Sequence, residues 1–127
     1  MTIGLWHSLV FTDADAGIAW LEAIGFRAKD VYRDPENPSV VLHAEMLWPT
    51  GGGVMFGSHR DNPDWPKQPG TAAAYLVTDD VDAVYAAALE AGGSSLREPR
   101  DEDYGGRGAS VRDPEGNLWS FGSYAPA

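Results

Sequence analysis

The 127-residue sequence contains no cysteine. This absence excludes a disulfide scaffold, a thiolate nucleophile and any cysteine-ligated zinc or iron–sulfur site. The first seven residues, MTIGLWH, lack the basic start and the long apolar run of a signal peptide. No apolar stretch approaches the roughly 20 residues that a membrane helix needs. We therefore expect a cytoplasmic protein without a membrane partner.

Basic residues are also scarce. Nine Lys and Arg stand against nineteen Asp and Glu, which gives a net charge of −10, and both halves of the chain share the excess of acid. Because a surface of this sign repels phosphate backbones, we expect no nucleic-acid partner. The same charge favours a cationic or neutral small-molecule ligand over an anionic one.

The residues that are present suit one soluble domain, residues 1–127, with 43% hydrophobic and 22% charged side chains. An internal repeat divides this domain in two. The segments VFTDADA, from Val10, and LVTDDVDA, from Leu76, each open a helical pattern, and the two patterns end in LEAIG and LEAGG. The offset of 66 to 68 residues indicates two copies of one unit.

Each half shows the same order of strand and helix signals. An apolar strand leads into a Thr-Asp helix cap, and Gly25 or Gly92 stops the helix. Three further strand-like segments follow in each half. The expected strands are 5–11, 26–32, 40–48 and 53–57, then 73–77, 94–97, 107–112 and 117–124. We predict an α+β fold of two βαβββ modules, about 1–60 and 70–127, joined by a linker at 61–69.

Four stretches, together with this order, carry a resemblance to a known family. They are HSLVFTD at 7–13, Gly25-Phe26, HAEM at 43–46 and DPEGNLW at 113–119. The chain resembles the vicinal oxygen chelate superfamily, which contains glyoxalases, extradiol dioxygenases, fosfomycin-modifying enzymes and bleomycin resistance proteins. The resemblance implies four-stranded sheets that curl around an open cleft, with the helices outside. It also implies a divalent metal that binds two neighbouring substrate oxygens.

The resemblance also indicates where metal ligands would stand. In each module one ligand comes from the first strand, six residues before the Asp of the helix cap, and one from the last strand. These positions hold His7 and Met55 or Phe56 in the first module, and Ala73 and Ser120 in the second. Alanine cannot coordinate a metal and a neutral serine is a poor ligand. We therefore predict no metal and no other cofactor, as in a bleomycin-resistance-like branch of the family.

A different metal set stays open at this point. His43 and Glu45 are two residues apart on a strand and point to one face. Together with His7 they would give a His-His-Glu set for a metal-dependent lyase, transferase or dioxygenase. The alternative is that His43 and Glu45 form a polar pair that faces water or braces the sheet.

A nucleophilic Ser120 is disfavoured, because no Gly-x-Ser-x-Gly turn or neighbouring base accompanies it.

Alternation along the strands indicates which side chains line the cleft. His7, Leu9 and Phe11 are expected on the cleft face of the first strand, and Trp119 and Phe121 on the helix side. Two tryptophans outside the expected core, Trp48 and Trp65, either plug the end of the sheet or clamp a planar ligand. A Tyr-Gly-Gly-Arg segment either covers the ligand or is fixed by an ion pair of Arg107. The candidate ligand-binding residues are His7, Phe11, Trp48, Met55, Trp65, Tyr104 and Ser120.

These observations predict a metal-free protein that binds a planar, cationic or neutral antibiotic-like compound and protects the cell by sequestering it. No catalytic residue is assigned. The resemblance further implies a homodimer whose clefts are built from both chains. A metal-dependent enzyme is the second hypothesis, and a scaffold for a protein partner has no positive support.

Overall fold

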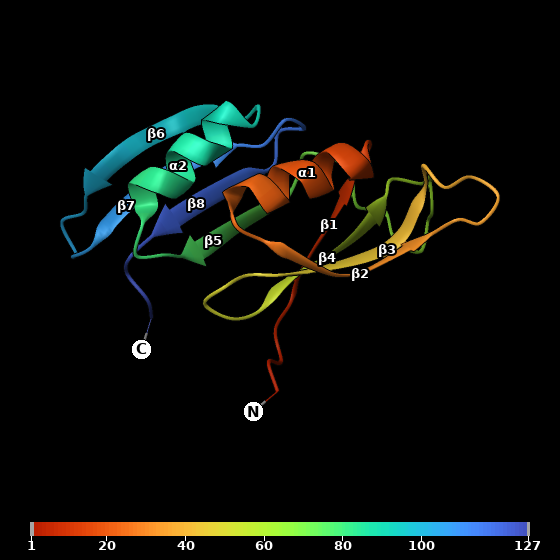
Figure 1. Ribbon diagram of the computed structural model, residues 1–127, viewed down its shortest axis with the longest axis horizontal. Helices are drawn as coiled ribbons and strands as arrows, with labels where there is room; N and C mark the ends of the chain where they lie inside the picture. The colour runs from red at the N-terminus through yellow and green to blue at the C-terminus, as the bar shows by residue number, and fades with distance from the viewer. Residues whose placement is uncertain (1, 127) are drawn as a thin grey trace.

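The structure, a computed structural model that describes residues 2–126, contains the two βαβββ modules (Figure 1). The first module consists of β1 (His7–Phe11), α1 (Ala14–Ile24), β2 (Arg27–Arg33), β3 (Val41–Leu47) and β4 (Gly53–Ser58). The second consists of β5 (Ala73–Val77), α2 (Val81–Glu90), β6 (Ser94–Asp101), β7 (Arg107–Arg112) and β8 (Leu118–Gly122). Neither α1 nor α2 is long and apolar enough to cross a membrane.

Each module forms its own mixed four-stranded sheet. The strand orders are β1-β4-β3-β2 and β5-β8-β7-β6, with β1–β4 and β5–β8 parallel and the other pairs antiparallel. Both helices lie on the same side of the two sheets and contact each other (Figure 1). The α+β prediction is therefore confirmed. We call the side of each sheet that faces away from the helices its outer face.

Strand β6 runs four residues further than expected. The expected strand ended at Arg97, and in the structure it continues past Pro99 to Asp101. In the structure β6 is an edge strand, so that the missing N–H costs no ladder bond.

The helix caps fix how the two modules correspond. The carboxylate of Asp13 accepts a hydrogen bond from the backbone N–H of Ala16 at 3.1 Å, and that of Asp80 from Ala83 at 3.4 Å. The second cap is therefore Asp80, one residue later than Asp79, and the modules are offset by 67 residues. It follows that His7 in β1 corresponds to Ala74 in β5.

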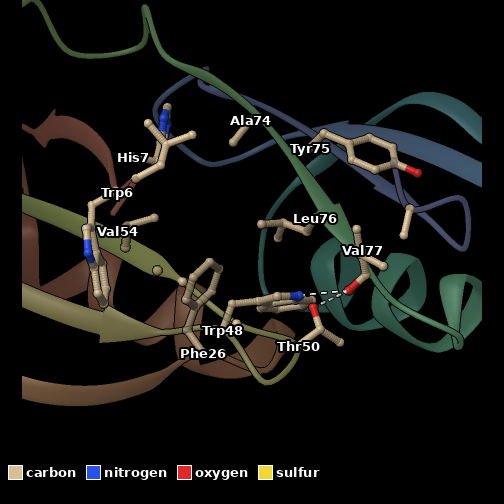
Figure 2. Close-up of a pocket in the computed structure, with 15 residues that line it drawn as sticks. Trp6, His7, Phe26, Trp48, Thr50, Val54, Ala74, Tyr75, Leu76 and Val77 are labelled. Atoms are coloured by element: carbon tan, nitrogen blue, oxygen red, sulfur yellow. Dashed lines mark hydrogen bonds between the residues drawn. The ribbon is translucent and has the colours of Figure 1, made fainter. Parts of the chain in front are cut away.

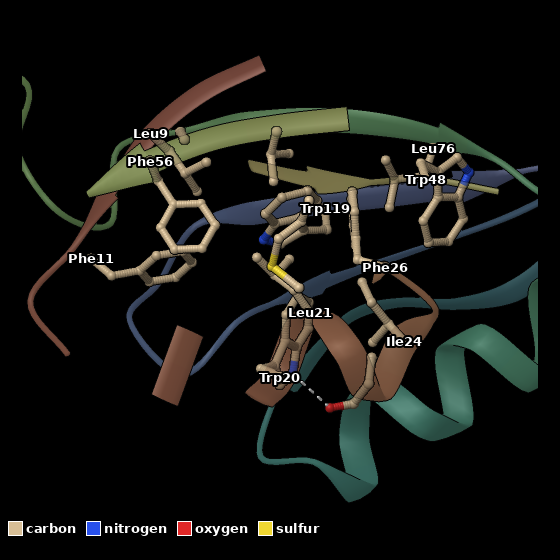
Figure 3. Packing of buried hydrophobic residues seen from close by; sticks show 14 of the residues in the cluster. Leu9, Phe11, Trp20, Leu21, Ile24, Phe26, Trp48, Phe56, Leu76 and Trp119 are labelled. Atoms are coloured by element: carbon tan, nitrogen blue, oxygen red, sulfur yellow. Dashed lines mark hydrogen bonds between the residues drawn. The ribbon is translucent and has the colours of Figure 1, made fainter. Parts of the chain in front are cut away.

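One hydrophobic core runs through both modules (Figure 3). Trp119 lies at its centre, with ring centroids 5.8 Å from Trp20 and 6.0 Å from Phe26. Trp20 also donates a hydrogen bond from Nε1 to the carbonyl of Ala88 at 3.1 Å, which joins α1 to α2. Because the same side chains serve both modules, the modules stabilise each other.

The prediction that Leu9 and Phe11 line the cleft is wrong. Both are 1% exposed, and Phe11 packs on the helix side against Gly17 of α1 and edge-on to Phe56 (Figure 3). The expected orientation of Trp119 and Phe121 is confirmed, since both are fully buried. The reason for the error is that Leu9, Val10 and Phe11 are all apolar, so β1 has no alternation to show which face is buried.

The Asp-Pro-Glu-Gly-Asn turn joins the two modules. The buried carboxylate of Asp113 accepts hydrogen bonds from the backbone of Glu115 and from Nε1 of Trp119, at 2.9 and 3.0 Å. The carboxylate of Glu115 then accepts from the backbone N–H groups of Thr12 and Asp13, at 2.6 and 2.8 Å. The turn that follows β7 therefore holds the start of α1 in the other module.

Candidate functional site

A cavity lies between the modules, and we call it the inter-module pocket (Figure 2). Its volume is about 560 Å³, and β1, β4 and β5 border it. The side chains that shape it are mostly apolar or aromatic. They include Trp6, His7, Phe26, Trp48, Thr50, Val54, Ala74, Tyr75, Leu76 and Val77.

Trp48 forms a wall of this pocket and also joins the modules. Its indole Nε1 donates a hydrogen bond to the carbonyl of Val77 at 2.8 Å, and Oγ1 of Thr50 donates to the same carbonyl at 3.0 Å (Figure 2). The indole also packs against Phe26, with ring centroids 4.9 Å apart. These contacts fix the aromatic wall, so that the pocket is largely formed before a ligand arrives.

His7 is the titratable imidazole of the inter-module pocket. It lies edge-on to Trp119, and its Nε2 is buried without a hydrogen-bond partner among the described residues. Burial lowers the pKa of His7 below its ordinary value of 6.5, and the positive charge of Lys67 lowers the pKa further. At neutral pH this side chain is therefore uncharged and retains a free hydrogen-bonding nitrogen.

A second cavity lies over the outer face of the first sheet, and we call it the linker hollow. Its volume is about 270 Å³. Residues of β1, β3 and β4 line it, together with the linker between the modules. They include Ser8, Val10, His43, Met55, Ser58, Arg60, Asn62, Trp65 and Lys67.

His43 and Glu45 form a polar pair on the outer face of β3. Nε2 of His43 lies 2.9 Å from Oε2 of Glu45, and Nζ of Lys29 lies 3.5 Å from the other carboxylate oxygen. The hydrogen bond with His43 and the charge of Lys29 lower the pKa of Glu45. His7 points to the opposite side of the sheet, so the His7–His43–Glu45 set is not assembled. Within residues 2–126 no group of three or more His, Asp or Glu is placed to hold a metal ion.

Ser120 lies on the outer face of β8, as alternation predicts, but it lines neither of the two cavities. Its hydroxyl oxygen is 2.8 Å from that of Ser110 on the neighbouring strand.

Tyr75 lies across Gly122, next to Ser120, and donates a hydrogen bond to the carbonyl of Tyr124 at 2.7 Å. Tyr104 packs edge-on against Tyr124 and is 65% exposed. Binding roles for Ser120 and Tyr104 therefore stay predictions.

A family model described as the Glyoxalase/Bleomycin resistance protein/Dioxygenase superfamily matches residues 5–121. The chain belongs to this superfamily.

Relatives agree with this assignment. A Mycobacterium tuberculosis protein named "Putative glyoxylase CFP32" is 39% identical over 123 residues, which cover 96% of this chain but 44% of the relative. The structure of TioX from Micromonospora sp. ML1 superposes with a TM-score of 0.72 at 28% identity, and covers 96% of this chain and 100% of TioX. Glyoxalase I from Zea mays shares the fold with a TM-score of 0.71 at 20% identity, over 97% of this chain and 45% of the maize chain.

The metal that the superfamily implies does not fit the residues at hand. His7 and Ala74, six residues before the caps Asp13 and Asp80, lie on the helix side of the sheets. The neighbouring outer-face positions are Trp6 and Ala73. The last-strand positions are Met55 and Ser120. An indole, a methyl, a thioether and a neutral hydroxyl do not form a site for a divalent ion.

The structure thus divides the predicted site residues. His7 and Trp48 meet in the inter-module pocket, and Met55 and Trp65 meet in the linker hollow. Phe11 belongs to the core, and a ligand-binding role for it is wrong. Sequence reasoning missed Trp6, Phe26, Arg60 and Lys67. Ala73 lies seven residues before the correct cap, Asp80. The same count back from Asp13 would have given Trp6.

Proposed function

We propose that this protein binds a neutral, planar aromatic small molecule in the inter-module pocket, without a metal. This function belongs to a bleomycin-resistance-like branch of the superfamily, in which binding alone sequesters the compound. The observation that carries it is the lining of the pocket. Aromatic rings of Trp6, Phe26 and Trp48 surround about 560 Å³ of space in which no Asp, Glu, Lys or Arg side chain takes part.

The chemistry of this lining sets the class of ligand. Flat aromatic walls favour a flat aromatic guest, through offset or edge-on contacts. His7 contributes an uncharged imidazole to the lining, but its Nε2 is buried, so the aromatic walls and not a hydrogen bond set the class of ligand. The net charge of the chain favours cations, but no charged side chain faces this pocket, so its lining favours a neutral compound.

An enzyme of the superfamily is less well supported. The name of the mycobacterial relative points to glyoxylase chemistry, yet this chain spans 44% of that protein. The metal-dependent alternative needs His7 beside His43 and Glu45, and the sheet separates them. We therefore assign no catalytic residue.

We further propose that the protein acts as a homodimer. Leu5 is 86% exposed ahead of β1, and Tyr75 and Leu118 are 44% and 41% exposed on the outer face of the second sheet. A second copy that covers these side chains would remove apolar surface from water and deepen the clefts.

Isothermal titration calorimetry with quinoline and isoquinoline tests the binding function. Trp6→Ala removes one aromatic wall and is expected to weaken binding about tenfold, the loss of one aromatic contact. Trp65→Ala, a matched truncation in the linker hollow, should leave the affinity unchanged. No measurable heat with either compound, or an equal loss in the two variants, would contradict the proposal.

A further inference from the structure

The linker hollow is built differently from the inter-module pocket. Its floor is the outer face of the first sheet, where Ser8, Val10 and Met55 lie. Its rim is the linker, which contributes Arg60, Asn62, Trp65 and Lys67. Trp65 is 54% exposed, so that one indole surface is available beside the cavity.

The charge around the linker hollow is opposite to that of the whole chain. None of its lining residues is Asp or Glu, although the net charge of the protein is −10. Arg60 and Lys67 form no ion pair within residues 2–126, whereas most of the other Lys and Arg side chains are paired with carboxylates. Two of the four cations without an ion pair in the described part of the chain, Arg60 and Lys67, therefore line this one cavity.

The acidic residues nearest in sequence do not neutralise this charge. Asp61 is fully exposed and lies 3.5 Å from His59. Asp64 is exposed on the same linker and lines neither cavity. On the sheet side, Glu45 is already paired with His43 and Lys29.

We infer that the linker hollow is a second binding site, for a small aromatic carboxylate. The planar guanidinium of Arg60 matches a carboxylate with two parallel hydrogen bonds, and the ammonium of Lys67 adds a second positive charge. The indole of Trp65 and the thioether of Met55 offer contacts to an aromatic ring. Ser58 accepts a hydrogen bond from the backbone of Val41 at 2.9 Å, which leaves its hydroxyl proton free to donate.

This site goes beyond the proposed function, because it lies in another cavity and selects the opposite kind of ligand. A volume of about 270 Å³ suits a one-ring acid and falls just below the usual range of drug-sized pockets. Ligand binding at the two sites can therefore be tested independently.

Amide NMR titration of the intact protein with benzoate, and with the neutral isostere benzamide, tests the inference. Benzoate should shift the amides of Ser8, Met55–Ser58 and the non-proline residues of Arg60–Lys67. It should bind about tenfold more tightly than benzamide, the worth of one charge-assisted contact. The double variant Arg60→Gln/Lys67→Gln should bind the two compounds equally. Arg27→Gln/Arg112→Gln alters two other unpaired cations, carries the same net charge and should keep the preference for benzoate.

Three results would overturn the inference. They are equal affinity of the wild-type protein for benzoate and benzamide, an equal loss in both double variants, and shifts confined to the inter-module pocket. Because each spectrum also reports folding, a misfolded variant is recognised directly. A parallel titration with quinoline separates this site from the proposed function.

Discussion

The side chain of His7 lies where the core meets the inter-module pocket. Counting from Asp13 placed it correctly on the first strand but on the wrong face, because β1 has no polar–apolar alternation to show which face is buried. Its pairing with the buried Val54 puts it on the helix side. The count in the second module is off for a separate reason, since the second helix begins after Asp80 and not Asp79. No residue pattern distinguishes these two neighbouring aspartates. In the structure only the side chain of Asp80 caps α2, and it accepts the hydrogen bond of Ala83.

The titration of His7 is a direct prediction at this scale. Since its folded-state pKa lies below 6.5, the unfolded chain binds more protons as the pH falls through that value. The stability that neutral His7 contributes is thus fully present above 6.5 and is lost as the pH falls toward the folded-state pKa. Proton NMR of the imidazole should give a midpoint below 6.5.

The variant His7→Gln supplies the matching stability measurement. Denaturant unfolding at several pH values should show a shallower loss of free energy below pH 6.5 in this variant than in the wild type. His59→Gln, which leaves His7 in place, serves as the control. A midpoint at or above 6.5, or identical pH slopes for His7→Gln and the wild type, would contradict the inference that burial lowers the pKa of His7.

At the scale of elements, helices and turns could be predicted better than strand faces. The start of α1 follows from its Thr-Asp cap and its end from Gly25, whose φ of 125° an L side chain rarely adopts, whereas α2 starts one residue later than its Thr-Asp pair predicts. The linker hollow could not be predicted, because it depends on how residues 59–72 fold back over the first sheet. Its cations, Arg60 and Lys67, are seven residues apart and show no motif.

The Asp-Pro-Glu-Gly-Asn turn carries the element-scale prediction. In Glu115→Gln the charged acceptor for the N–H groups of Thr12 and Asp13 is lost, and the free energy of unfolding should fall by about 1 kcal/mol. Glu98→Gln, on the exposed edge strand β6, should change it by less than about 0.5 kcal/mol. Equal effects of the two substitutions in urea unfolding would show that the turn does not brace α1.

At the scale of the whole molecule, the repeat and the family motifs were sufficient for the fold. The shared core of Trp20, Phe26 and Trp119 was not foreseen, because contacts between the modules leave no periodic signal in the sequence. The outer face of the first sheet carries the linker hollow, and the outer face of the second sheet is the surface that the proposed second copy would cover.

Light scattering after size-exclusion chromatography tests the proposed dimer. The expected mass is twice the 13.7 kDa of the chain. Leu118→Lys places a charge on the outer face of β8 and should shift the protein toward the monomer mass. Ala19→Lys, on the exposed side of α1, should remain dimeric. A wild-type protein of 13.7 kDa would refute the dimer.

The central claim is that this member of the superfamily binds its ligand without a metal, because Trp6, Met55, Ala73 and Ser120 occupy the outer-face positions. Calorimetric titration with quinoline, on protein stripped with EDTA and again after addition of Zn²⁺, Mn²⁺ or Ni²⁺, tests it most directly. The account predicts the same affinity in every sample and no stoichiometric uptake of metal. Binding that appears only after a metal is added would contradict it.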